Sequence, residues 1–223
     1  MAQDIVIAID GFSGVGKSST ARAVARALEY TYIDTGAMYR AATLYFIQHQ
    51  VDINHLPEVA QALNQVHIQL KDNETFLNGQ PVEDAIRSME VSQHVSAVST
   101  LPVVRQAMVA QQRRMGEDKR VVMDGRDIGT HVFPQAELKI FMTADPRIRA
   151  QRRQQELSEK GQTVELTDIA QNLTQRDQID TTRAENPLKK APDAIEIDTT
   201  HLRFDEQVAQ ITSLAQQIIQ KAQ

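Results

Sequence analysis

The amino-acid sequence predicts an α/β protein with a parallel central sheet. Short apolar segments rich in β-branched residues alternate along the chain with helix-forming segments, as in doubly wound α/β proteins. A glycine-rich loop joins the first expected strand to the first expected helix, and polar loops follow the next two strands. With 223 residues and 41% apolar content, the chain suffices for one such core with insertions and hardly for two independent domains.

Five segments have the composition of buried parallel strands. They are residues 5–10, 31–34, 120–124, 138–142 and 194–197. The first of them, Ile-Val-Ile-Ala-Ile-Asp, is almost wholly apolar, and the alanine-rich segment 21–28 that follows is a strong helix former. We therefore expect a strand, a loop and a helix at the N-terminal end of the fold.

Residues 11–18, Gly-Phe-Ser-Gly-Val-Gly-Lys-Ser, match the phosphate-binding pattern G-x-x-x-x-G-K-[ST] at every fixed position. Glycines let the backbone curl so that several N–H groups face one anion, aided by the helix dipole. Lys17 would then contact the β- and γ-phosphates of a nucleoside triphosphate, and the Ser18 hydroxyl would hold Mg²⁺. The alternative is a glycine-rich turn that binds nothing, which the strand and helix on either side disfavour.

A long insertion separates the second and third strands. Segment 66–70 alternates apolar and polar residues, and residues 71–74 interrupt it. Segments 75–77 and 80–82 then flank Asn78-Gly79, a favoured two-residue hairpin turn. We expect a small antiparallel sheet here, which either decorates the fold or belongs to a lid or substrate-holding subdomain.

A second insertion, from Asp145 to about Thr182, is rich in charge and glutamine. Asp145-Pro146 is a good helix start, and residues 160–162, Lys-Gly-Gln, predict a break between two helices. Arginines at positions 147, 149, 152 and 153 follow helical spacing. They form either a solvated helix face or an arginine-rich lid that closes over phosphoryl groups.

Composition excludes several classes of function. The formal charge is −5, so no overall basic field attracts nucleic acid or an anionic membrane. There is no cysteine, and hence no disulfide or thiolate chemistry, and the aromatic content of 4% disfavours a base-stacking platform. No apolar stretch approaches the roughly 18 residues needed to span a bilayer. We expect a cytoplasmic monomer that binds neither nucleic acid nor membrane and has no obligate protein partner.

Arginines and aspartates follow two of the expected strands. Segments 34–40, Asp-Thr-Gly-Ala-Met-Tyr-Arg, and 124–129, Asp-Gly-Arg-Asp-Ile-Gly, would both leave the carboxyl edge of a parallel sheet beside the glycine-rich loop. Arg40 and Arg126, with Arg176 and Arg183 later in the chain, are therefore candidates to clamp a second phosphate. Each alone is also explained as a surface charge or a local ion pair.

The two aspartates of the second segment have competing interpretations. Asp124 ends a strand, where a carboxylate commonly orders metal-bound water. Asp127 either belongs to a binding site or caps the turn that follows it. Four of the six histidines, at positions 67, 94, 131 and 201, show no ligand spacing.

With these motifs, the chain resembles bacterial cytidylate kinases over nearly its whole length. The resemblance rests on residues 9–18, 34–40, 124–129, 139–141, 176–183 and 197–200, and on the insertion with its hairpin. The glycine-rich loop occurs in countless nucleotide-binding proteins, whereas segments 34–40 and 124–129 together are specific to the family. Phe12 departs from the family, which usually has proline there; it fills a variable loop position and leaves the glycines unchanged.

The resemblance implies a three-layer P-loop kinase fold with a parallel central sheet in a single domain, 1–223. Its expected parts are a core (1–34, 116–145 and 183–223), a nucleoside-monophosphate (NMP)-binding insertion with a small antiparallel sheet (35–115) and a helical lid (146–182). It implies ATP-dependent phosphorylation of CMP and dCMP by direct in-line transfer, with Mg²⁺ as cofactor. Another P-loop kinase for a different small molecule, or a nucleotide-dependent switch without turnover, are the rival interpretations.

The family's functional residues map onto matching positions of this chain. The arginines matching Arg40, Arg126 and Arg183 grip the monophosphate, and those matching Arg176 and Asp180 hold the ribose. The residues matching Ser96, Arg105 and Asp127 read cytosine, whose amino donor needs an acceptor next to donors for its N3 and O2. The full expected set for CMP is Thr35, Arg40, Ser96, Arg105, Arg126, Asp127, Arg176, Asp180 and Arg183.

Three further sets complete the expected site. The ATP phosphates are expected at Gly11, Ser13, Gly14, Val15, Gly16, Lys17, Ser18, Ser19 and Arg152. Catalysis is expected from Lys17, Arg126 and Arg183. The metal is expected at Ser18, with waters ordered by Asp124.

Overall fold

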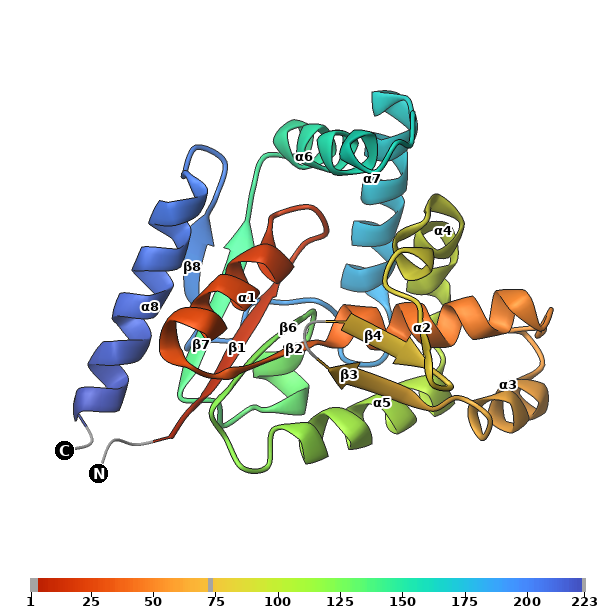
Figure 1. Cartoon of the computed structure of the whole chain (residues 1–223), viewed down its shortest axis with the longest axis horizontal. Helices are drawn as coiled ribbons and strands as arrows, with labels where there is room; N and C mark the ends of the chain where they lie inside the picture. The colour runs from red at the N-terminus through yellow and green to blue at the C-terminus, as the bar shows by residue number, and fades with distance from the viewer. Residues whose placement is uncertain (1–3, 72–73, 222–223) are drawn as a thin grey trace. The chain divides into compact units, whose positions relative to one another are not determined.

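The structure, a computed structural model, describes residues 4–71 and 74–221. Its ribbon is drawn in Figure 1. Contacts between Cα atoms divide the chain into two compact units. We call Met1–Tyr32 with Asp118–Gln223 the core unit, and Ile33–Glu117 the insert unit.

A five-stranded sheet forms the centre of the core unit. Its strands are β1 (Val6–Gly11), β2 (Thr31–Asp34), β6 (Val121–Gly125), β7 (Leu138–Thr143) and β8 (Ile195–Asp198), in the order β2-β6-β1-β7-β8. β1 pairs in parallel with β6 and β7, and β7 pairs in parallel with β8. Every residue of the central strand β1 is buried, which explains why its first four residues are all apolar. The five predicted strands are confirmed, with ends that differ by one residue.

Two helices cover one face of this sheet. α1 (Lys17–Leu28) and α8 (Phe204–Lys221) lie side by side, as Figure 1 shows. Val24 of α1 and Ile211 of α8 join the buried apolar cluster of the strands. The predicted helix 21–28 begins earlier than expected, at Lys17, because the glycine-rich loop leads directly into its first turn.

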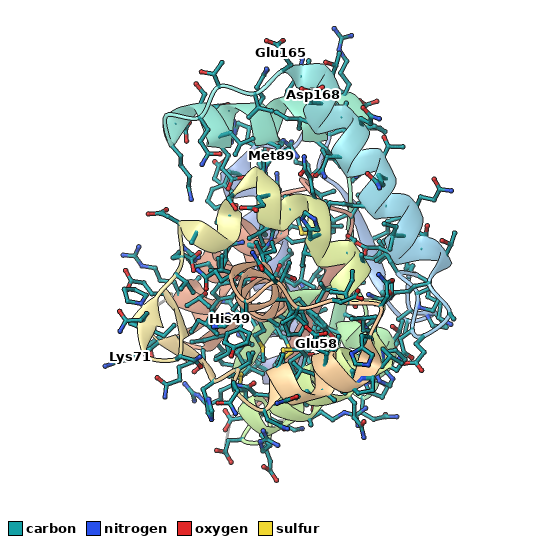
Figure 2. The ribbon with its side chains drawn as sticks, turned by 90° about the vertical axis from the view of Figure 1, so that its right-hand side faces the viewer. His49, Glu58, Lys71, Met89, Glu165 and Asp168 are labelled. Carbon is teal, nitrogen blue, oxygen red and sulfur yellow. The ribbon has the colours of Figure 1, made fainter. Side chains whose placement is uncertain are left out.

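The second insertion of the sequence folds as two helices packed against each other, α6 (Pro146–Glu159) and α7 (Leu166–Thr182). The Asp145 carboxylate accepts a hydrogen bond from the Arg147 amide (2.8 Å), so the predicted helix start is confirmed. The predicted break between the two helices at residues 160–162 is also confirmed, and Gly161 takes the left-handed conformation there (φ 73°). Figure 2 shows Glu165 and Asp168 where α7 begins, the end of a helix at which acidic side chains are favourable.

The insert unit holds four α-helices, one 3₁₀ turn and a small sheet among the residues that the structure describes. Its elements are α2 (Thr35–Gln48), α3 (Leu56–Leu63), β3 (Ile68–Lys71), β4 (Glu74–Leu77), β5 (Gln80–Pro81), the 3₁₀ turn η1 (Ala85–Arg87), α4 (Met89–Val98) and α5 (Pro102–Met115). β3, β4 and β5 form an antiparallel sheet in that order. α2 packs against α4 and α5 around a second buried apolar cluster.

The hairpin prediction is confirmed in its turn and wrong in its first strand. Asn78 (φ 50°) and Gly79 (φ 79°) both take positive φ, as a tight hairpin turn requires. β3 begins at Ile68 rather than Val66, because the Val66 amide donates to Leu63 O and completes the turn after α3. Residues 71–74 were predicted to interrupt the strands, but Lys71 is the last residue of β3 and Glu74 is the first residue of β4. Residues 72 and 73 lie outside the described part of the chain.

Over residues 4–71 and 74–221, we find no helix that combines the length and the apolar character needed to cross a membrane.

Candidate active site

The glycine-rich loop leaves the end of β1 under tight steric constraint. Gly11 has φ 146°, and a Cβ built on it would lie 2.1 Å from Met142 O of the neighbouring strand. Gly16, at φ 90°, is the N-cap of α1 and provides no side-chain cap. The first N–H groups of α1 therefore lack a capping side chain, which is the arrangement that a phosphate group satisfies.

Lys17 lies within this loop as a buried cation. Its side chain is 6% exposed, and Nζ donates a hydrogen bond to Phe12 O (2.5 Å). Burial, and then the positive charge of Arg126, hold the pKa of Lys17 well below its ordinary value. An anion placed against Nζ would raise the pKa of Lys17 again and so oppose both effects.

Ser18 and Asp124 are joined by a hydrogen bond beside the loop. Ser18 Oγ donates to Asp124 Oδ2 (3.0 Å), and Tyr32 Oη donates to Asp124 Oδ1 (2.8 Å). Asp124 is buried near the end of β6, as expected from its position in the sequence. The role of Tyr32 was missed, because the residue belongs to none of the recognised motifs.

Arg126 connects three separate parts of the core unit. From the loop after β6, its Nη2 donates to Ser13 Oγ of the glycine-rich loop (2.6 Å), and its Nε donates to Asp180 Oδ2 of α7 (2.8 Å). Burial raises the pKa of Asp180, but the positive charges of Arg126 and Arg176 outweigh it, so that the pKa of Asp180 is lowered. The structure therefore brings together residues that were predicted for both phosphates.

Arg183 and Asp127 form a second buried ion pair. Arg183 Nη2 donates to Asp127 Oδ1 (3.1 Å), and its Nε and Nη2 also donate to Asn186 O. Asp127 precedes η2 (Ile128–Val132), a short π-helical turn, but makes no side-chain capping hydrogen bond to it. The capping interpretation of Asp127 is therefore wrong.

The turn is instead held by Asp10, a residue to which the sequence assigned no separate role. Asp10 Oδ1 accepts from the Ile128 amide (2.8 Å) and Oδ2 from the Gly129 amide (2.7 Å). The carboxyl group is 4% exposed. Burial raises its pKa to about 7, although the two amides lower it. Asp10 thus fixes the loop that carries Arg126 and Asp127 to the end of β1.

Arg176 of α7 is another buried arginine of the core unit. Burial is the largest influence on it, followed by the positive charge of Arg126, and together they lower its pKa to about 10. Asp180 opposes this shift only in part. The charge of Arg176 is therefore carried at a cost in free energy.

The arginines of α6 have different environments. Arg149 is buried, donates Nη1 to Ser13 O (3.2 Å) and to Asp177 Oδ2 (2.5 Å), and lies over the Phe12 ring. Arg152 donates to Thr199 O (2.6 Å), and its expected contact with the ATP phosphates stays a prediction. A solvated helix face therefore describes the exposed Arg147 but not Arg149.

The remaining residues expected to bind CMP belong to the insert unit and are all buried. Thr35 begins α2, and Arg40 lies on the same helix and donates Nη1 to Ile86 O (3.0 Å). Ser96 lies on α4 and Arg105 on α5. The Asp34 carboxylate caps α2 by accepting from the Ala37 amide (2.8 Å). Buried polar side chains on three helices of one unit point to a polar ligand.

The parallel sheet, the phosphate loop at the start of α1 and the buried arginines around it define a P-loop phosphotransferase. The family model described as cytidylate kinase matches residues 7–217. The chain belongs to the cytidylate kinase family, and it is an enzyme that phosphorylates CMP.

Curated relatives match over nearly the whole chain. A cytidylate kinase of Cytophaga hutchinsonii is 56% identical over 95% of this chain and 93% of its own length. One of Bacteroides fragilis is 53% identical over 91% and 93%, respectively. One of Porphyromonas gingivalis is 47% identical over 98% and 99%. The similarity therefore extends over both units.

Proposed function

We propose that the protein transfers the γ-phosphoryl group of ATP to CMP and dCMP by direct in-line attack, without a covalent enzyme intermediate. The observation that carries the proposal is the position of Arg126, which hydrogen-bonds the glycine-rich loop through Ser13 and α7 through Asp180. One guanidinium thus connects the loop proposed for ATP with a residue proposed for CMP. A monophosphate acceptor is already anionic at neutral pH, so no general base is required.

Lys17, Arg126 and Arg183 are proposed to carry catalysis. In phosphoryl transfer the protein contributes mainly positioning and stabilisation of the charge on the transferring group. All three side chains are cationic and belong to the core unit, and Lys17 and Arg183 are buried. Fixed charges in a site with little water stabilise a transition state more strongly than solvated ones.

The residues present fit a magnesium ion. Mg²⁺ prefers oxygen ligands and keeps several waters, so it is usually held by one or two protein oxygens together with substrate phosphates. The Ser18 hydroxyl and the Asp124 carboxylate supply such oxygens, 3.0 Å apart. Within residues 4–71 and 74–221 there is no cluster of three or more acidic, histidine or cysteine side chains that would form an all-protein cage. When bound, the ion would neutralise charge on the ATP phosphates.

For the acceptor nucleotide, we propose that Arg40, Arg126 and Arg183 bind its phosphate, that Arg176 and Asp180 bind its ribose, and that Thr35 contributes from the start of α2. Ser96, Arg105 and Asp127 are proposed to read the base. The Asp127 carboxylate would accept from the amino group of cytosine, a donor that uracil lacks. Weaker phosphorylation of UMP follows from this pairing.

A coupled assay for ADP tests the proposal. With ATP and Mg²⁺ present, ADP should form when CMP or dCMP is added and much more slowly with AMP, GMP or UMP. ADP formation without any acceptor would favour a nucleotide-dependent switch. A preference for shikimate or another small acceptor would favour a different P-loop kinase. The cytoplasmic location and the monomeric state stay predictions, which fractionation and size-exclusion chromatography would test.

A further inference from the structure

Arg87 occupies the centre of a polar network in the insert unit, and no motif of the sequence includes it. It is the last residue of η1, between the small antiparallel sheet and α4. Its Nη2 donates to Asp34 Oδ2 (2.7 Å) and to Glu83 Oε1 (2.8 Å), and its Nε also donates to Glu83 Oε1 (3.1 Å). A single guanidinium therefore holds two carboxylates from different segments.

On one side, the network reaches the start of α2. The other oxygen of Asp34 accepts from the Ala37 amide (2.8 Å) and caps the helix that begins with Thr35. Burial raises the pKa of Asp34, but the charge and hydrogen bond of Arg87 outweigh it, so that the carboxylate stays ionised. Arg87 thus fixes the cap, and the cap fixes the first turn of α2.

The same segment touches α2 at a second point. The carbonyl of Ile86, the residue before Arg87, accepts from Arg40 Nη1 (3.0 Å). Arg40 lies about one and a half turns from the cap. η1 therefore contacts both ends of the part of α2 that carries Thr35 and Arg40.

On the other side, the network reaches the small sheet. Glu83 Oε2 accepts from Thr75 Oγ1 of β4 (2.8 Å). Thr75 is 2% exposed and the Glu83 side chain is 29% exposed, so this hydrogen bond is partly buried. The chain of contacts runs from β4 through Glu83, Arg87 and Asp34 to α2.

We propose that Arg87 is a positioning residue for the acceptor nucleotide, and that the small antiparallel sheet holds it in place. Arg87 acts through Asp34 and η1 on Thr35 and Arg40 and does not itself touch the nucleotide. The inference rests on the proposed function, in which Thr35 and Arg40 bind CMP. It gives the insertion a role in acceptor binding beyond that of a decoration.

The test compares Arg87→Met, Arg87→Lys and Thr75→Val in steady-state kinetics. Arg87→Met leaves Asp34 and Glu83 without their shared cation, and we expect KM for CMP to rise about tenfold or more while KM for ATP changes less than about twofold. Arg87→Lys keeps the positive charge but cannot donate from several guanidinium nitrogens at once, so its KM for CMP should lie between those of the wild type and Arg87→Met. Thr75→Val removes only the last hydrogen bond of the network and should raise KM for CMP about two- to threefold.

Arg203→Met is the matched control, because Arg203 forms an exposed ion pair with Asp205 and should leave both constants unchanged. Equal changes of both KM values in Arg87→Met would overturn the inference, as would unchanged KM for CMP. If Arg87→Met does not fold, Thr75→Val decides, and an unchanged KM for CMP in that variant overturns it. Arg40→Met separates the two proposals: if it too leaves KM for CMP unchanged, acceptor binding by Arg40 is itself wrong.

Discussion

Replacing Arg176 by methionine should stabilise the protein while it removes acceptor binding. Arg176 is buried on α7, and burial together with the positive charge of Arg126 lowers its pKa in the folded protein to about 10. At about pH 7.5 the guanidinium is charged in both the folded and the unfolded chain. The full cost of burying its charge is therefore present under ordinary assay conditions.

The size of the effect follows from the pKa. The lowering of the pKa of Arg176 to about 10 corresponds to about 3 kcal/mol of unfavourable interaction, with the attraction to Asp180 already included. Methionine keeps most of the apolar length of the side chain but cannot replace the hydrogen-bonding capacity of the guanidinium. We expect a net gain in the free energy of unfolding of about 1–2 kcal/mol, or a rise in Tm of about 2–8 °C.

Thermal unfolding with and without CMP is the measurement. The wild-type protein should gain stability when CMP is present in excess over its Kd, as any ligand of the folded state produces. The variant should start from a higher Tm and gain little. Arg147→Met, which replaces an exposed arginine of α6, is the control and should behave as wild type in both conditions. A variant with a lower Tm than wild type, or with an undiminished gain from CMP, would refute the reasoning.

Three further predictions concern the core unit. Lys17→Ala should lower kcat by on the order of 10² or more, because a contact that strengthens in the transition state is lost; turnover close to wild type in a folded variant would contradict it. Asp127→Ala should raise KM for CMP much more than KM for ATP, since the variant loses the acceptor for the amino group of cytosine, and equal effects on both substrates would remove Asp127 from the base site. Asp10 should take up a proton on folding between about pH 4 and 7, because its folded pKa is about 7 against 3.8. The free energy of unfolding, measured by urea denaturation, should therefore fall by about 2–3 kcal/mol from about pH 5 to about pH 7.5 relative to that of Asp10→Asn. The same pH dependence in both proteins would falsify this.

The sequence was sufficient for the fold because its signals are local. The apolar residues 6–9 are explained by burial on both faces of a parallel sheet, and Asn78-Gly79 by the positive φ of both turn residues. The start of β3 was predicted wrongly for a reason of the same kind. Val66 continues the alternating pattern, but its amide is already used in the turn after α3.

The site was predictable only as far as its residues lie in motifs. The contacts between motifs depend on pairs that are far apart in sequence. Asp10 accepts a hydrogen bond from the amide of Ile128, 118 residues away in the sequence, and Arg87 donates one to Asp34, 53 residues away. No periodicity or spacing relates such partners, so the roles of Asp10, Tyr32 and Arg87 emerge only from the folded chain.

Two cations of the core unit, Lys17 and Arg176, share one property: the folded protein lowers the pKa of both. Arg126 contributes to both shifts, yet its own pKa is raised because the charge and hydrogen bond of Asp180 outweigh its burial. An anion next to Lys17 or Arg176 would oppose these shifts. Lys17 is proposed to bind the ATP phosphates and Arg176 the ribose of CMP, so the positive charge of Arg126 acts on a residue proposed for each substrate.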